Sequence, residues 1–349
     1  MKRFLFGFDE GQPERCARQL RDRGVDAVIV GGADERARAA LAENGLELHL
    51  SYGAHGLGAD FDRQEHWAVH ASGGVARWFH SGCPNDEALA GARLNAVLER
   101  ACRTPGVRGV WVDGARFASF ASAEGTEGFF SCFCPRCMRK MEALGIDAER
   151  VRSAALRLSA ERRISDEAAI ADWFRFRAAC VAEFMTRFAE RVHALPGRPL
   201  AGAFVFAPSL AGFVGQTARA CAALDAVSPM LYRAYPHEDG PACLGHEWAA
   251  AREMFEPRVL AQLSELAGGQ WIPADGVERL RTRGFSPEHV GREVSAARAQ
   301  LRRGQTLMPI LQIEDERLAD SANAALRAGA DGCGYFMCGQ APLEALPRP

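Results

Sequence analysis

Four cysteines form the most distinctive chemical feature of the sequence. Three stand within six residues in Cys132-Phe-Cys134-Pro-Arg-Cys137, and the fourth, Cys83, is followed by Pro-Asn-Asp. Four thiolates on loops suit a tetrahedral Zn²⁺ ion, and a four-sulfur site has no open position, so its role would be structural. The alternative is a set of reduced loop cysteines without a metal. An iron–sulfur cluster is less favoured because the spacing is not the usual ferredoxin-like one.

Two carboxylates stand where a predicted strand ends. Asp113 closes an apolar run, and Glu314 follows another in Pro309-Ile-Leu-Gln-Ile-Glu314. An inward-pointing Arg116 would hold Asp113 ionised, because a neighbouring guanidinium lowers the pKa of a carboxyl group. The alternative for Asp113 is a structural ion pair with Arg116. The alternative for Glu314 is a solvated helix start, where a negative charge complements the helix dipole.

Other polar and aromatic side chains gather after predicted strands or in the long loops. Asp9 and Glu10 follow the first strand and could bind substrate hydroxyls, although a cap for a helix starting at Pro13 is an equal alternative. Tyrosine offers a flat apolar face and a hydroxyl to a sugar, whereas a single histidine is more often structural than catalytic. The remaining candidates for substrate binding are Tyr52, His55, His80, Tyr232, Tyr235, His237 and Gln312.

Alternating strands and helices must position these side chains. Eight short apolar runs, typical of strands buried on both faces, alternate with amphipathic stretches and predict a (β/α)₈ barrel. The predicted strands are Phe4–Phe8, Asp26–Val30, Leu46–Ser51, Gly109–Asp113, Ala201–Phe206, Asp225–Leu231, Leu307–Ile313 and Gly332–Met337. The predicted helices between them are Glu14–Arg23, Asp34–Asn44, Asp86–Arg103, Gly215–Leu224, Pro287–Arg303 and Leu318–Ala328. A doubly wound sheet is the alternative fold, but no glycine-rich dinucleotide fingerprint follows the first strand. We expect no organic cofactor.

Two connections are long, and both follow strands. Tyr52–Asn85 comes after the third strand, and Gly114–Arg198 after the fourth, the latter with helical stretches near Ala148–Glu161 and Asp166–Leu195. Loops after barrel strands cover the carboxyl ends of the strands, where barrel active sites lie. We expect one barrel domain over residues 1–349, with a helical, cysteine-rich insertion at about 114–198.

Composition narrows the class of protein. The 349 residues are 48% hydrophobic and 25% charged with a net charge of −2, which is typical of a globular protein and argues against a nucleic-acid or membrane-surface partner. An odd count of 11 cysteines and no visible signal peptide indicate a cytoplasmic protein with reduced thiols. The sequence leaves the oligomeric state open, a homo-oligomer included.

One segment resembles a known enzyme family. The order Cys83-Pro-Asn-Asp, a helix, Gly106-Val-Arg-Gly-Val-Trp-Val-Asp113 and the three-cysteine loop is similar to glycoside hydrolase family 42 β-galactosidases, over about Arg77 to Met138. That family pairs such segments around a structural zinc ion, so the resemblance implies zinc at the four cysteines. The family ends its fourth strand with Asn-Glu, the Glu being the acid/base, whereas Gly114-Ala115 stand here. Asp113 to Phe117 resembles instead the Asp-x-x-Arg strand end of other glycosidase-like barrels.

The resemblance implies a divergent glycoside hydrolase acting on a small or modified glycoside. Related barrel glycosidases carry two catalytic carboxylates at the fourth and seventh strand ends, which here are Asp113 and Glu314. Two alternatives stay open: a carbohydrate-binding barrel without hydrolytic activity, and a lyase or isomerase that uses Asp113 and a histidine.

Overall fold

The computed structural model describes residues 2–121, 126–233, 244–269, 277–337 and 343–347. Its centre is a closed barrel of parallel strands, which confirms the predicted (β/α)₈ fold. Neighbours along the chain pair in order, and the barrel closes where β11 pairs with both β1 and β10. The strands are β1 (Arg3–Phe6), β2 (Ala27–Val30), β3 (Glu47–Gly53), β6 (Val107–Asp113), β7 (Leu200–Phe206), β8 (Ala226–Met230), β9 (Thr306–Leu307), β10 (Ile310–Gln312) and β11 (Cys333–Phe336).

The seventh strand of the barrel is split into β9 and β10. Pro309 lies between the two pieces and has no N–H to donate to a neighbouring strand. β9 pairs with β8 at Thr306 and Leu307, and β10 meets the same strand at Ile310 and Met230. Both pieces therefore occupy one position in the barrel, as the single predicted run implied.

Aromatic side chains fill the barrel interior. Trp111 lies with its ring centroid 5.5 Å from that of Phe4 and 5.3 Å from that of Phe204. Gly202 makes room for this cluster, because a Cβ atom there would stand 2.6 Å from the Trp111 ring. Glycine on an inward-facing strand position thus compensates for the bulk of its neighbour.

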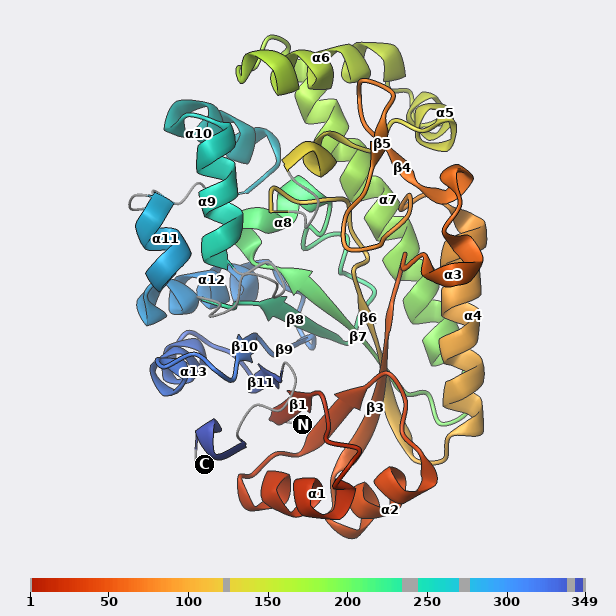
Figure 1. Cartoon of the computed structure of the whole chain (residues 1–349), viewed down its shortest axis with the longest axis vertical. Helices are drawn as coiled ribbons and strands as arrows, with labels where there is room; N and C mark the ends of the chain where they lie inside the picture. Colours follow the sequence, from red (N-terminus) through yellow and green to blue (C-terminus); the bar gives the residue numbers. More distant parts are fainter. Residues whose placement is uncertain (1, 122–125, 234–243, 270–276, 338–342, 348–349) are drawn as a thin grey trace.

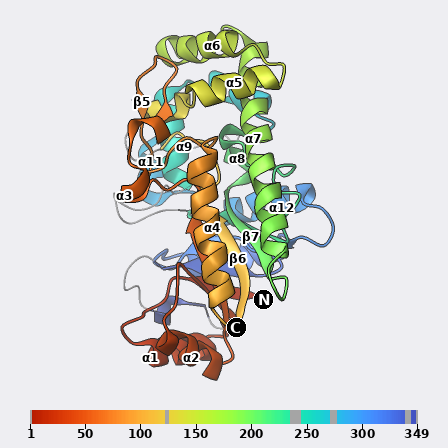
Figure 2. The same cartoon turned by 90° about the vertical axis from the view of Figure 1, so that its right-hand side faces the viewer.

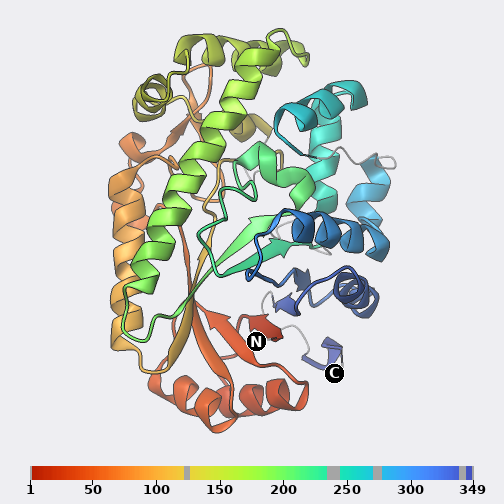
Figure 3. The ribbon, with the colours of Figure 1, turned by 180° about the vertical axis from the view of Figure 1, so that it is seen from behind.

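Helices surround the barrel, and most begin or end within a few residues of their predicted bounds. They include α1 (Pro13–Asp22), α2 (Glu35–Glu43), α4 (Glu87–Arg103), α7 (Glu167–His193), α12 (Pro287–Gln300) and α13 (Leu318–Arg327). Side chains of Asp34, Asp86 and Asp166 accept backbone N–H groups at three of the helix starts. Figures 2 and 3 show α4 and α7 side by side along the outside of the barrel.

The helix predicted over Gly215–Leu224 is wrong. The structure has α8 (Pro208–Val214) directly after β7, and turns follow it. Pro208 fits the first turn of a helix, and Gly215 ends α8 with a φ of 84°, a left-handed conformation that favours glycine. A Cβ atom on Gly215 would also approach the carbonyl oxygen of Arg177 to 2.6 Å.

The long connections form the end of the molecule opposite α1 and α2 (Figure 1). The connection after β3 holds α3 (Gly58–Phe61) and the hairpin of β4 (Ala68–Val69) with β5 (Val75–Ala76), and the one after β6 holds α5 (Pro135–Ala143) and α6 (Ala148–Glu161) ahead of α7. A third long connection follows β8, with α9 (Leu244–Met254), α10 (Pro257–Leu266) and α11 (Val277–Arg283). In the part of the chain with described coordinates, no helix has the length and apolar character needed to cross a bilayer.

Candidate functional site

The four predicted cysteines come together in one buried cluster. The sulfur atoms of Cys83, Cys132, Cys134 and Cys137 all lie within 4.8 Å of one another. Cys83 Sγ is 3.5 Å from the sulfurs of both Cys134 and Cys137. Sulfurs bound at about 2.3 Å around a tetrahedral ion would be roughly 3.8 Å apart, so the cluster matches a four-thiolate metal site in donors and size.

Local structure holds these sulfurs in place. Cys134 caps the start of α5, and Pro135 takes the first helical position. Asn85 donates from its side chain to Cys137 Sγ at 3.2 Å and from its backbone to Cys83 Sγ at 3.4 Å. Without a metal ion the four thiols share protons: hydrogen bonds from neighbouring thiols hold the pKa of Cys134 far below its ordinary value, whereas the pKa values of Cys83 and Cys137 lie well above theirs. The cluster links the segment after β3 to the segment after β6.

Besides the cysteine cluster, an ion pair joins the same two segments. Asp86 Oδ2 lies 2.9 Å from a guanidinium nitrogen of Arg136 on α5, while Oδ1 accepts the Leu89 backbone N–H at the start of α4. The Asp86 carboxylate also lies 2.7 Å from His66 Nδ1. The Cys-Pro-Asn-Asp motif therefore supplies a sulfur, an amide and a carboxylate to one junction.

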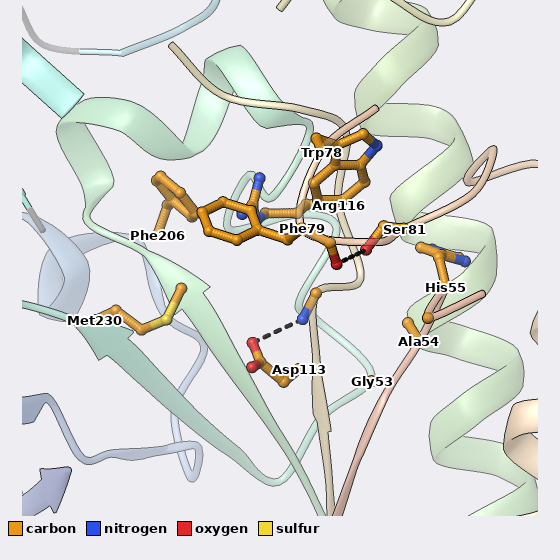
Figure 4. A pocket seen from close by; sticks show the side chains of 12 residues that line it. Gly53, Ala54, His55, Trp78, Phe79, Ser81, Asp113, Arg116, Phe206 and Met230 are labelled. Carbon is orange, nitrogen blue, oxygen red and sulfur yellow. Dashed lines mark hydrogen bonds between the residues drawn. The ribbon is translucent and has the colours of Figure 1, made fainter. Parts of the chain in front are cut away.

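A cavity of about 250 Å³ opens at the carboxyl ends of β3, β6, β7 and β8 (Figure 4). Asp113 of β6 lines it, as do the last residues of two neighbouring strands, Phe206 and Met230. The segment after β3 contributes His55 and Trp78. The cavity therefore lies at the end of the barrel where the sequence placed the active site.

Asp113 is the one carboxylate among the described residues that line this cavity. Its Oδ1 accepts the Gly114 backbone N–H at 2.7 Å. Burial raises the pKa of Asp113 above its ordinary value, and the charge of Arg116 only partly offsets this effect. The expectation that Arg116 would keep Asp113 ionised by lowering its pKa is therefore not met, because desolvation outweighs the attraction.

Arg116 points into the site but forms no ion pair with Asp113, both being described residues. Its guanidinium lies among the rings of Trp78, Phe79 and Phe206, with centroid distances of 4.6, 5.7 and 4.5 Å (Figure 4). One nitrogen donates to the Phe117 carbonyl at 3.0 Å. Burial lowers the pKa of Arg116 to about 10, which leaves it positively charged at neutral pH.

His55 lines the cavity as an uncharged ring. Burial lowers its pKa to about 3, and its ring centroid lies 5.2 Å from that of Phe184 on α7. Nδ1 is sealed from solvent without a hydrogen-bond partner in the described structure. A neutral imidazole can accept a proton or a hydrogen bond, but it adds no charge to the site.

Several predicted site residues that the structure describes do not line the cavity. Tyr52 packs against Phe188 of α7 in the layer between barrel and helices, at a centroid distance of 6.0 Å, because side chains alternate between the two faces of β3. His80 is exposed. Asp9 and Glu10 are also exposed, and Asp9 accepts the Gly11 backbone N–H in a turn rather than capping α1, whose cap residue is Gln12. Tyr235 and His237 lie outside the described residues.

Glu314, Gln312 and Tyr232 lie on neighbouring strand ends. Gln312 is buried and donates from its side-chain amide to the Glu314 carboxylate, while its own oxygen has no described partner. Tyr232 packs within the barrel interior, with its ring 5.5 Å from that of Phe336. Ile310 of β10 stands opposite Met230 of β8, which lines the cavity. Glu314 follows Ile310 by four residues along the chain.

Sequence reasoning overlooked two kinds of site residue. Phe206 ends a predicted strand and Met230 is the residue before the end of another, so the rule that located Asp113 would have led to both had apolar residues been considered. Glu247 on α9 is fully buried behind the site, accepts from Ser119 Oγ at 2.7 Å and the Ala121 N–H at 3.0 Å, and attracts Arg116. No local pattern marks it, since α9 is buried on nearly all sides and has no amphipathic stripe.

Comparison with known proteins identifies the same fold. No family model matches the sequence, and a search of curated proteins also finds no match. Among solved structures, a β-galactosidase from the Antarctic haloarchaeon Halorubrum lacusprofundi is 16% identical with a TM-score of 0.62, over 96% of this chain and 52% of that one. A catalytic mutant of Gan42B, a GH42 β-galactosidase from G. stearothermophilus, is 12% identical with a TM-score of 0.57, over 95% of this chain and 51% of that one. The chain thus spans about half the length of these structures and shares the barrel fold of glycoside hydrolase family 42 β-galactosidases.

Proposed function

We propose that this barrel hydrolyses a small or modified glycoside, with Asp113 as one of two catalytic carboxylates. The observation that carries the proposal is the place of Asp113, at a strand end in the wall of the cavity, with a pKa raised by burial. A raised pKa suits a general acid, which must hold its proton near neutral pH. Solved barrels of the same fold are β-galactosidases, which favours glycosidic bonds as the target.

In this proposal Asp113 protonates the oxygen of the leaving group. The Gly114 N–H fixes Oδ1, so Oδ2, which has no partner among the described groups, carries the proton toward the substrate. Half-buried Phe79 and Met230 offer apolar surface to the C–H face of a sugar ring. Glu314, at the end of β10, would be the second carboxylate, attacking the anomeric carbon or activating water.

We also propose that the four cysteines hold a structural Zn²⁺ ion. All four sulfurs are buried and close together, and Asn85 donates hydrogen bonds to two of them. The ion would cross-link the two segments whose residues His55, Trp78 and Arg116 line the cavity. Its contribution is to the shape of the site, and no step of the reaction uses it.

Release of the aryl group from a panel of aryl glycosides tests the hydrolase proposal. We expect the wild-type protein to cleave at least one, and Asp113→Asn to lose about 10²–10⁴-fold in rate, the usual contribution of a general acid. Asp22→Asn, which changes an exposed residue of α1, is the matched control and should keep full activity. Activity that survives in Asp113→Asn would remove Asp113 from the chemistry.

A sugar-binding barrel without hydrolytic activity is the second candidate. It is favoured by the finding that Asp113 has no second carboxylate beside it among the described lining residues. Saturable binding of a sugar at the cavity, with no cleavage of any glycoside in the panel, would support this candidate over the hydrolase.

A further inference from the structure

Arg116 is a buried cation that forms no ion pair with any carboxylate of the described residues. Its residue is 6% exposed, and among the described carboxylates none lies within ion-pair distance of it. Within the described part of the chain, one of its nitrogens has a hydrogen-bond acceptor, the Phe117 carbonyl. Removing a guanidinium from water is costly unless its charge and donors are satisfied, so this arrangement is incomplete without a ligand.

Aromatic rings surround the guanidinium of Arg116 at the wall of the cavity. The rings of Trp78 and Phe206 lie within 4.6 Å of the guanidinium carbon and cover it. Nε and Nη2 have no acceptor in the described structure, yet neither is among the polar atoms sealed from solvent. Because Arg116 lines the cavity, these N–H groups are the donors that it could offer to a ligand there. Stacking on aromatic rings orients a guanidinium while leaving its edge available for hydrogen bonding.

The charge of the cavity favours an anion. The described wall of the cavity contains three ionisable side chains, Arg116, Asp113 and His55. Arg116 is positive, Asp113 is negative when ionised, and His55 is neutral. When Asp113 holds its proton, as a general acid must, Arg116 is the one charge left in the described cavity wall. Glu247 is a buried carboxylate that also attracts Arg116, but it lies on α9 and does not line the cavity, and burial raises its pKa, which weakens its negative charge.

We propose that Arg116 binds a carboxylate on the sugar, so that the substrate is a glycoside of a hexuronic acid. This inference rests on the proposed hydrolase function for its substrate but concerns recognition alone. A planar carboxylate can accept two parallel N–H bonds from a guanidinium edge, which a neutral hydroxymethyl group cannot. A cavity of about 250 Å³ is below the roughly 300–1,000 Å³ of drug-sized sites, which suits one sugar unit.

Equilibrium binding of free monosaccharides tests the proposal without any need for catalysis. Calorimetry on the wild-type protein would compare glucuronate and galacturonate with glucose and galactose. We expect at least one hexuronate to bind ten times or more tighter than its neutral counterpart. The methyl ester of that hexuronate keeps the shape but removes the charge, and it should lose the advantage.

Variants at Arg116 locate the effect. Arg116→Gln should abolish the preference for the hexuronate, and Arg116→Lys should restore part of it, because lysine keeps the charge but not the planar fork. Circular dichroism checks that both variants fold, and the methyl-ester comparison stands without them. Equal binding of hexuronate, ester and neutral sugar would overturn the proposal, as would a preference that persists in Arg116→Gln.

Two further outcomes separate this inference from the hydrolase proposal. Tight binding of a hexuronate with no cleavage of any aryl glycoside would end the hydrolase proposal and leave the role of Arg116 intact. Cleavage of neutral glycosides with no preference for hexuronides would do the reverse. A galactose 6-sulfate that binds tighter than either hexuronate would overturn the carboxylate assignment in favour of a sulfated sugar.

Discussion

Replacing Cys83 by serine should loosen the junction between the two segments that build the site. Cys83 is the one ligand that the segment after β3 gives to the cluster, and the other three cysteines come from the segment after β6. Cys83→Ser therefore removes the proposed cross-link while leaving three thiols in place. A serine hydroxyl is a much poorer partner for Zn²⁺ than a thiolate.

The size of the effect follows from the chain length between the linked segments. Cys83 and Cys132 enclose a loop of about 50 residues, and the chain-entropy relation for a cross-link of that length gives about 4 kcal/mol at 25 °C. A large domain loses roughly 2 °C of Tm per kcal/mol, so we expect a fall of about 8 °C. Asp86 and Arg136 also join the segments, and their ion pair limits further loss.

Metal content and thermal unfolding measure this prediction together. Wild-type protein purified without chelator should contain about one zinc per chain, as expected for a single four-thiolate site, and should lose Tm when a strong chelator is added. Cys83→Ser should contain clearly less zinc and respond weakly to chelator. Cys102→Ser, an exposed cysteine on α4, makes the same chemical change away from the cluster and should match the wild type.

Two results would refute the reasoning. One is wild-type protein without bound metal whose Tm ignores the chelator. The other is a Cys83→Ser protein whose Tm and metal content equal those of Cys102→Ser.

Three more predictions concern stability. Burial raises the pKa of Asp113, so the folded protein holds this proton up to a higher pH than the unfolded chain does. Wild-type stability therefore falls as the pH rises above the ordinary Asp pKa of about 3.9. The Tm of Asp113→Asn minus that of the wild type should increase from pH 4 to pH 7, and a difference that shrinks would contradict the assignment. Arg177→Met should lower the free energy of unfolding by about 3 kcal/mol or more in urea denaturation. Buried Arg177 donates to three backbone carbonyls, which would lose this partner. An unchanged urea midpoint would show that these carbonyls find other donors. Gly202→Ala should cost about 1–3 kcal/mol in the same assay, since the new Cβ would stand 2.6 Å from the Trp111 ring. Gly31→Ala, which has open space at its Cβ and no left-handed φ, is the control and should cost less.

The barrel could be predicted because its strands are short apolar runs with clear boundaries. All eight predicted strands exist, and the prediction even joined β9 and β10, which share one place in the barrel. The error over Gly215–Leu224 arose because an amphipathic pattern outweighed a stronger local signal, namely Pro208 to start a helix and Gly215 to end it. α9 escaped detection because a helix buried on nearly all sides has no polar face to reveal its period.

The candidate site was predictable in part. The spacing of Cys132, Cys134 and Cys137 indicated a metal site, and the Cys-Pro-Asn-Asp segment with its family resemblance added Cys83; the strand-end rule placed Asp113 in the cavity wall. Side-chain direction was harder, because Tyr52 also ends a strand but faces α7, and one residue of register decides between the two faces. Whether the pKa of Asp113 rises or falls depends on two opposing effects: burial raises it, and the charge of Arg116 lowers it. Neither the burial of Asp113 nor its distance to Arg116 can be read from the sequence.

The most direct test of the central claim is a crystal structure of Asp113→Asn bound to a glycoside that the wild-type protein cleaves. We expect the sugar in the cavity between residue 113 and Met230, with the glycosidic oxygen within about 3 Å of the side chain at position 113. A glycoside bound at another place on the barrel, or in the cavity with its glycosidic oxygen out of hydrogen-bond reach of that side chain, would contradict it.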